Sequence, residues 1–277
     1  MLCAGSVRKK NTHNTMLKNL LDACAAAIAY FCVGYAFAYG GDSTANGTTF
    51  VGTSNFFGTG DISLPFFFYQ YTFAAMAVTI VAGALAERCQ MAAYLGYSFF
   101  LTSFVYPIIV HQVWSRAGFL SYSNPNPLFG IGMIDFAGSG VIHVTGGATS
   151  FLGCYLLGSR RGRFYDVKTG EKLEKPKSIP GHSPSLQMLG TFILWFDWFG
   201  FNAGGSLLLA QSQYQAEIAG GCVTNTFLGA ACGCIASLMV RLIMSKRNGG
   251  QAIFDLIAAM NGTLCGLVSV SFSVSIP

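Results

Sequence analysis

The chain has 277 residues, of which 52% are hydrophobic and only 10% are charged, and its formal net charge is +5. Its mean hydropathy is +0.50. A soluble domain carries about a quarter of its residues as charged side chains, so this composition excludes an ordinary soluble domain. We therefore predict a polytopic membrane protein whose surface faces lipid.

Seven stretches are long and apolar enough to cross about 30 Å of hydrocarbon, which takes about 20 helical residues. Each should be an α-helix, because backbone amides in lipid find no water and must bond within their own segment. The fold class that we predict is thus all-α, with about seven spanning helices. The predicted spans are Leu17–Tyr39, Phe66–Leu85, Met91–Trp114, Phe136–Leu157, Leu186–Ala203, Gly221–Leu242 and Ile253–Val270.

The basic residues predict the orientation of these spans. If every stretch crosses, all but one of the 16 Lys and Arg residues fall on the same side, and Arg116 is the exception. Cytoplasmic loops carry an excess of Lys and Arg, so we predict that the N-terminus and the 158–185 loop are cytoplasmic and that the protein lies in the plasma membrane. This distribution accounts for the net charge without a nucleic-acid partner.

The nine cysteines do not indicate a metal site. Most lie in apolar runs, where cysteine acts as a small apolar packing residue, and no two have the CxxC spacing of zinc sites. The sequence also contains no evident nucleophile–base pair or phosphate-binding loop. We therefore predict neither an enzyme nor a bound metal or cofactor.

Two glycine pairs have the GxxxG spacing that lets helices approach closely in lipid: Gly229 with Gly233, and Gly262 with Gly266. Two interpretations stay open. The pairs could support tight packing of helices within the chain, or they could form a dimerisation surface.

An ionisable residue inside a membrane span is a functional hypothesis by default, and the fourth predicted span presents two. Asp135 lies at its outer entrance, where a carboxylate can also serve simply as a helix cap. His143 comes eight residues later, which in an α-helix places it about 12 Å deeper and about 80° around the helix. Its imidazole can line a path for a polar solute or a proton, or it can be a packing histidine.

Aromatic residues concentrate near the predicted outer ends of the spans. Trp114 ends the third span, Tyr69 and Phe73 are four residues apart on one face of the second, and Phe201 lies in the fifth. One interpretation is an interfacial aromatic belt. The other is a vestibule for a cation, because aromatic faces attract cations without a fixed negative charge.

Five motifs, in order, resemble those of the ammonium transporter family, the Amt/Mep branch related to Rh proteins. Each motif alone is weak, but together they cover nearly the whole chain. The resemblance implies a single transporter domain over residues 1–277 and a homotrimer of helical bundles, each with its own pore. The motifs are AGSVRKKN (Ala4–Asn11), GYAFAYG (Gly34–Gly40), GALAER (Gly83–Arg88), DFAGSGVIH (Asp135–His143) and WFGFNAG (Trp198–Gly204).

The resemblance also implies roles for the aromatic residues. Trp114 and Phe73 match the family's outer aromatics that recruit ammonium, and Tyr69 falls at a neighbouring aromatic position. Ser206 comes one place after the position where the family often has a recruiting serine. Phe73 and Phe201 match the stacked phenylalanine gate.

Asp135 matches the family's signature aspartate, and His143 matches the first of its two pore histidines. The implied mechanism recruits ammonium, removes its proton, conducts neutral ammonia through an apolar lumen and returns the proton by a separate route. The implied partners are thus ammonium or ammonia and membrane lipid.

The chain begins where the family's first helix ends, and it stops before the helices that carry the second pore histidine. We therefore expect an incomplete transporter domain. Two alternatives stay open: a Rh-like channel for the neutral gas, and a non-conducting ammonium sensor or interaction subunit, which the missing second histidine favours.

Overall fold

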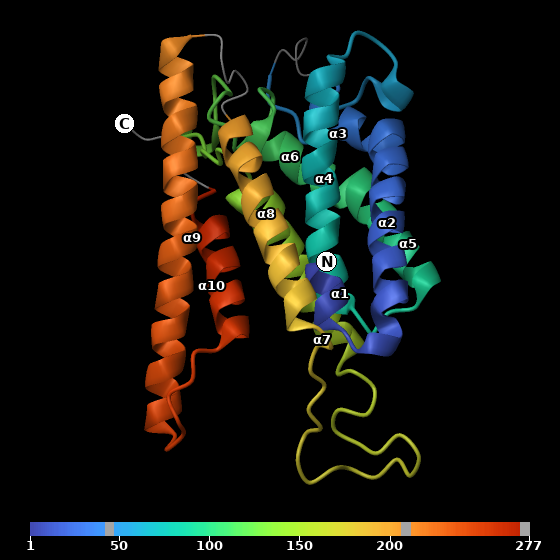
Figure 1. The fold of residues 1–277 in the computed structure, drawn as a ribbon. Coiled ribbons are helices and arrows are strands. Elements are labelled where there is room, and N and C mark those ends of the chain that lie inside the picture. Colours follow the sequence, from blue (N-terminus) through green and yellow to red (C-terminus); the bar gives the residue numbers. More distant parts are fainter. Residues whose placement is uncertain (42–46, 206–211, 272–277) are drawn as a thin grey trace. The chain divides into compact units, whose positions relative to one another are not determined.

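A computed structural model describes residues 1–41, 47–205 and 212–271 (Figure 1). Regular structure in these ranges is helical, and strand pairing within them is limited to three isolated β-bridges. The all-α prediction is confirmed. The chain divides into two compact units: unit 1 comprises residues 1–9, 135–139 and 181–277, and unit 2 comprises residues 10–134 and 140–180.

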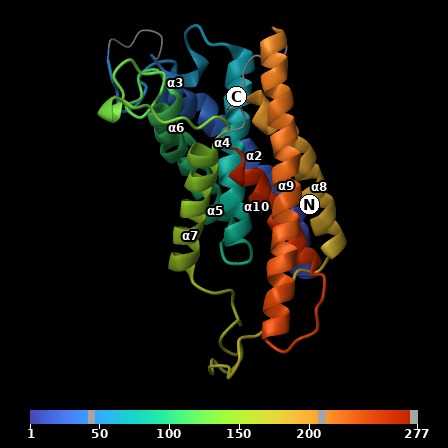
Figure 2. The ribbon, with the colours of Figure 1, turned by 90° about the vertical axis from the view of Figure 1, so that its left-hand side faces the viewer.

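Unit 2 contains six α-helices in the described chain: α2 (Thr12–Ala29), α3 (Tyr35–Tyr39), α4 (Leu64–Leu85), α5 (Met91–Phe100), α6 (Tyr106–Trp114) and α7 (Thr145–Leu157). Helix α4 packs against α2 and α7, while α2 also packs against α5, and α3 against α6. The two views in Figures 1 and 2 show α4 within this group. Short 3₁₀ turns are η1 (Lys9–Asn11), η3 (Phe56–Gly58) and η5 (Leu128–Gly130).

Three π-helical segments interrupt or begin these helices. They are η2 (Tyr30–Gly34) between α2 and α3, η4 (Leu101–Val105) between α5 and α6, and η6 (Ser139–Val144) before α7. Segments η2 and η4 meet backbone to backbone at Gly34, where an added Cβ would lie only 2.6 Å from the carbonyl oxygen of Thr102. Glycine is therefore needed for this close approach.

Unit 1 contains α1 (Leu2–Ser6), α8 (Pro184–Gly204), α9 (Gln213–Arg247) and α10 (Leu256–Ser269). Side-chain caps mark where the three longer helices begin, because each satisfies backbone N–H groups that have no partner within the helix. Ser183 accepts from the N–H of Leu186, Ser212 caps α9 in the same way, and Asp255 accepts from the N–H groups of Ile257 and Ala258.

Helices α9 and α10 run side by side in both views (Figures 1 and 2). The two GxxxG pairs lie at this contact. A Cβ on Gly233 would lie 2.3 Å from the carbonyl oxygen of Gly262, and one on Gly266 would lie 2.0 Å from that of Gly229. The glycines thus support close packing of two helices within this chain, the first of the two interpretations from the sequence.

All seven predicted spans contain helix, but their lengths differ. Within the described residues, α8 has 21 residues and α10 has 14, so α10 is shorter than predicted because it begins only after the Asp255 cap. Helix α9 has 35 residues and extends past both predicted ends. In the part of the chain that the structure describes, five helical stretches are long and apolar enough to cross a membrane: Lys9–Tyr39, Leu64–Leu85, Met91–Trp114, Ser139–Leu157 and Gln213–Arg247.

Candidate functional site

Three aromatic side chains of unit 2 form the core of the candidate site, and we call them the aromatic cluster: Tyr69, Phe73 and Trp114. The ring centroids of Tyr69 and Phe73 are 4.5 Å apart with an interplanar angle of 65°. Those of Phe73 and Trp114 are 5.8 Å apart at 48°. The four-residue spacing on α4 places Tyr69 and Phe73 on one face, as predicted, and the fold adds Trp114 from the end of α6.

The aromatic cluster is partly accessible. Phe73 is only 3% exposed, whereas Tyr69 and Trp114 are half-buried. The tilted and edge-on arrangement is the geometry that aromatic pairs prefer, because their ring edges are positive and their faces negative. Such faces attract a small cation, and the attraction grows as the cation loses water. The cluster is therefore suited to hold a cation at the border of an apolar region.

His111 holds the end of α6 in place, and the sequence did not predict this role. It is 1% exposed. Its Nδ1 lies 2.8 Å from the carbonyl oxygen of Ala38, which can only accept, so Nδ1 donates. Its Nε2 lies 2.8 Å from the Thr49 hydroxyl, which donates to the neutral ring. His111 thus ties α6 to α3 and to the following loop, one turn before Trp114.

His143 lies in the π-helical segment η6, between buried Ile142 and exposed Val144. Its side chain is 9% exposed. π-turns are rare and occur frequently at functional sites. A buried imidazole in such a segment has one nitrogen that can donate and one that can accept, which suits it to contact a polar solute in an apolar lumen.

Asp135 belongs to unit 1 and is 5% exposed. Its Oδ1 accepts a hydrogen bond from the backbone N–H of Gly138, 3.0 Å away. Residues 135–138 are not helical, and the helix begins at Ser139 rather than at the predicted Phe136. The predicted separation from His143, about 12 Å and about 80°, assumed continuous α-helix, and that assumption is wrong because these residues form a bend and then a π-turn.

Phe201 lies on α8 in unit 1 and packs on Trp198, with ring centroids 5.5 Å apart at 41°. The indole N–H of Trp198 donates to the hydroxyl of Ser271 at 3.3 Å, and this contact fixes the pair against the residues after α10. Because Phe73 belongs to unit 2, the stacked Phe73–Phe201 gate stays a prediction. Ser206 lies outside the described residues.

A second polar group in unit 2 links α2 to α5. The Tyr94 hydroxyl donates to Oδ2 of buried Asp22 at 2.5 Å. One turn earlier on α2, the Lys18 ammonium donates to the Cys89 carbonyl at 2.7 Å and lies 5.0 Å from the centre of the Tyr94 ring. Sequence reasoning could not identify this pair, because no local pattern signals a contact 72 residues away.

The chain is similar to known proteins along nearly its whole length. The model of the Ammonium Transporter Family matches residues 1–276. The chain is 39% identical to Ammonium transporter 1 member 3 of Solanum lycopersicum, over 100% of this chain and 58% of that protein. It is 40% identical to Ammonium transporter 3 of Dictyostelium discoideum, over 99% of this chain and 58% of that protein. The chain therefore spans less than two thirds of the length of these relatives.

Solved structures are also similar to this chain. One described as Sensor Amt Protein superimposes with a TM-score of 0.81 at 29% identity, covering 99% of this chain and 63% of that chain. Mep2 of Candida albicans superimposes with a TM-score of 0.73 at 29% identity, covering 92% of this chain and 52% of that chain.

Proposed function

This chain belongs to the ammonium transporter family and is a multi-pass membrane protein, and we propose that it transports ammonium across the membrane. The observation that carries the proposal is the aromatic cluster, which brings Tyr69, Phe73 and Trp114 together from two helices. Ammonium is a small cation that has to lose water before it enters an apolar path. Ring faces bind such a cation while leaving it free to move on.

In the proposed mechanism, the aromatic cluster and Ser206 recruit ammonium at the outer face. Phe73 and Phe201 close the entrance to bulk water, so a hydrated ion cannot pass without losing its shell. Ammonium gives up its proton at this point, because a neutral solute crosses an apolar lumen at far lower cost than a charge. Neutral ammonia then moves inward, and the proton follows with it or by a separate route.

His143 contacts the solute below the gate in this proposal. Its imidazole exchanges hydrogen bonds with ammonia and can take part in the transfer of the released proton. Asp135 acts at the outer end of the same chain segment: its bond to the Gly138 N–H shapes the bend that precedes η6. The carboxylate supports the geometry of the vestibule and favours the charged form of a nearby cation.

We further propose a homotrimer in the plasma membrane with a cytoplasmic N-terminus. The distribution of Lys and Arg supports this orientation, since nearly all of them fall on one side of the predicted spans. The 158–185 loop, with seven basic residues from Arg160 to Lys177, then faces the cytoplasm.

The proposal is tested by uptake of labelled methylammonium into cells that lack their own ammonium transporters. Trp114→Leu should weaken the apparent affinity by about tenfold, because it removes the largest cation-binding face. Phe68→Leu is the matched control: Phe68 also lies on α4 but is 64% exposed and outside the aromatic cluster. Equal uptake by wild type and Trp114→Leu would remove the cluster from the mechanism.

A second candidate function is ammonium sensing without conduction. The structure described as Sensor Amt Protein, which superimposes over 99% of this chain, favours it. A sensor would bind ammonium at the aromatic cluster but would show no uptake. Saturable binding by the purified chain together with absent uptake would select this candidate.

A further inference from the structure

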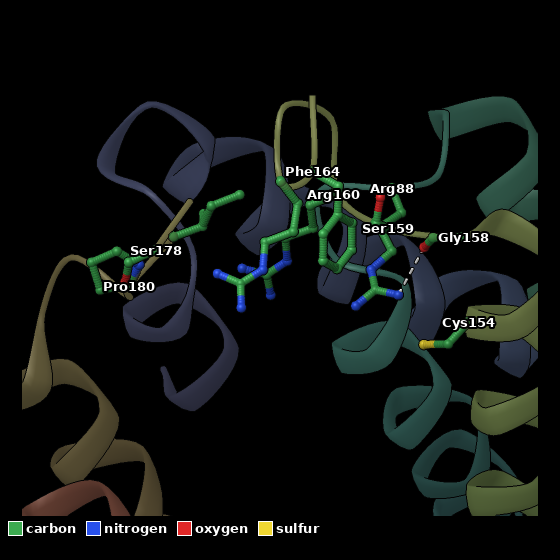
Figure 3. Close-up of a pocket in the computed structure, with 10 residues that line it drawn as sticks. Arg88, Cys154, Gly158, Ser159, Arg160, Phe164, Ser178 and Pro180 are labelled. Atoms are coloured by element: carbon green, nitrogen blue, oxygen red, sulfur yellow. Dashed lines mark hydrogen bonds between the residues drawn. The ribbon is translucent and has the colours of Figure 1, made fainter. Parts of the chain in front are cut away.

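Unit 2 contains a pocket at the end of α7, between the α4–α5 turn and the segment that follows Leu157 (Figure 3). Its volume is about 570 Å³. That volume is within the range of pockets that hold small organic ligands, about 300–1,000 Å³, and it exceeds what a single inorganic ion needs. The ten lining residues of the described chain include Arg88, Arg160 and Arg163, but no Asp or Glu.

Each arginine makes a polar contact that leaves further N–H donors, and the Arg163 guanidinium also lies 5.9 Å from the centre of the Phe164 ring. Arg88 donates through Nη1 to the carbonyl oxygen of Gly158 at 3.0 Å, which caps the end of α7 (Figure 3). Arg163 donates to the carbonyl oxygen of Lys177. Arg160 pairs with Glu87, with 3.3 Å between Nη1 and Oε2. A guanidinium has five N–H donors in a planar fork, so each retains capacity for a ligand.

Two carboxylates of unit 2, those of Glu87 and Asp166, are already bonded to other protein groups. Glu87 has a fully buried side chain, and its Oε1 accepts from the Asn11 amide at 2.5 Å. In the loop below, Asp166 accepts from the backbone N–H groups of Thr169 and Lys168, which lowers its pKa. With Glu87 balancing one guanidinium, two positive charges remain on the wall of the pocket.

We propose that this pocket binds a phosphate monoester carried by a larger molecule. A phosphate monoester has a charge of about −1.5 to −2 near neutral pH and three acceptor oxygens, which matches the two remaining positive charges and the planar donors. Arginine binds phosphate through paired, charge-assisted hydrogen bonds. The hydroxyls of Ser159 and Ser178 line the same space and can donate to the rest of the ligand.

The phosphate could come from a lipid headgroup or from a soluble compound, since the pocket lies where a predicted span ends. The inference does not rest on ammonium transport. The test measures binding of two probes to the purified, detergent-solubilised full chain: fluorescent phosphatidylinositol 4-phosphate in micelles, and inositol 1,4-bisphosphate, the headgroup of that lipid, as its soluble competitor. Fluorescent phosphatidylcholine is the lipid reference.

Wild type should bind phosphatidylinositol 4-phosphate more tightly than phosphatidylcholine, and Arg163→Gln should weaken that binding by about tenfold. Arg161→Gln is the matched control, because Arg161 is exposed and does not line the pocket. Displacement by inositol 1,4-bisphosphate would show that a soluble phosphate monoester suffices, and failure to displace would assign the site to the lipid. Equal weakening by both variants would overturn the proposal, because it would indicate general attraction to basic residues.

Glu87→Gln provides an independent test. It removes the carboxylate that competes for Arg160, so the affinity for phosphatidylinositol 4-phosphate should rise by about two- to fivefold. Loss of the folded pocket would lower the preference for phosphatidylinositol 4-phosphate over phosphatidylcholine, so a higher preference in Glu87→Gln supports the proposal even if Arg163→Gln lowers the Tm. Unchanged or weaker binding by Glu87→Gln in a folded chain would contradict the proposal, as would wild-type binding no tighter than that of phosphatidylcholine.

Discussion

Unit 2 buries two histidines in different ways. His111 lies in regular helix α6 with both ring nitrogens bonded to protein atoms, on Ala38 and Thr49. His143 lies in the π-helical segment η6, beside an exposed valine. Burial alone therefore does not separate a structural histidine from a functional one. The bonding partners indicate a structural role for His111, whereas the functional role that we propose for His143 rests on the family motif and the irregular backbone.

The largest expected effect is on transport by His143→Leu. Leucine has a similar volume but neither a donor nor an acceptor, so in the proposed mechanism ammonia would lose a polar contact and the proton a carrier. We expect uptake of labelled methylammonium to fall by about tenfold or more, while the Tm changes little. The distinction between the two histidines would be contradicted if His143→Leu lowered the Tm as much as His111→Leu and left the uptake of the remaining folded protein unchanged.

The next effect is on stability, from His111→Leu. This change leaves the buried carbonyl oxygen of Ala38 without its partner and removes the hydrogen bond to the exposed residue Thr49. A buried group without a partner costs about 1–3 kcal/mol and a lost hydrogen bond about 0.5–1.5 kcal/mol, so we expect the free energy of unfolding to fall by about 2–4 kcal/mol. Thermal unfolding in detergent measures this change, and Thr49→Val, which removes only the bond to the exposed hydroxyl, should lose about 0.5–1.5 kcal/mol. A Tm equal to that of wild type would show that these bonds do not hold α6.

The smallest effects concern the π-turns themselves. Gly34→Ala would place a Cβ 2.6 Å from the Thr102 carbonyl oxygen, where η2 meets η4. Overpacking of this kind costs about 1–3 kcal/mol. Gly96→Ala is the control: this glycine lies in α5 with no neighbouring atom within 4 Å, so alanine should stabilise the helix by about 0.5–1 kcal/mol. Equal Tm shifts for the two variants would argue against the close contact.

Much of the fold could be predicted from the sequence because the membrane restricts the possibilities. A long apolar stretch in lipid has to be helical, and the seven predicted stretches all contain helix. The π-turns could not be predicted, because the residues of Tyr30–Gly34 and Ser139–Val144 are of the same types as those in α-helical membrane segments. For this reason the predicted start of the fourth span, and the assumption of continuous α-helix from Asp135 to His143, were wrong.

Contacts within the candidate site were predictable where the spacing of two residues along one helix determines whether they are neighbours. Tyr69 and Phe73 are neighbours on α4 because they are four residues apart. The contact with Trp114 and the bonds of His111 depend on tertiary packing, and periodicity carries no information about that. The roles of Phe201 and Ser206 came from family resemblance alone and stay predictions.

The most direct test of the central claim is ammonium uptake by the purified chain in proteoliposomes. We predict saturable uptake above that of protein-free liposomes, and a strong reduction in proteoliposomes that contain the same amount of folded His143→Leu. Uptake no greater than in protein-free liposomes, from wild-type protein with an intact unfolding transition, would contradict the account and favour a sensing role.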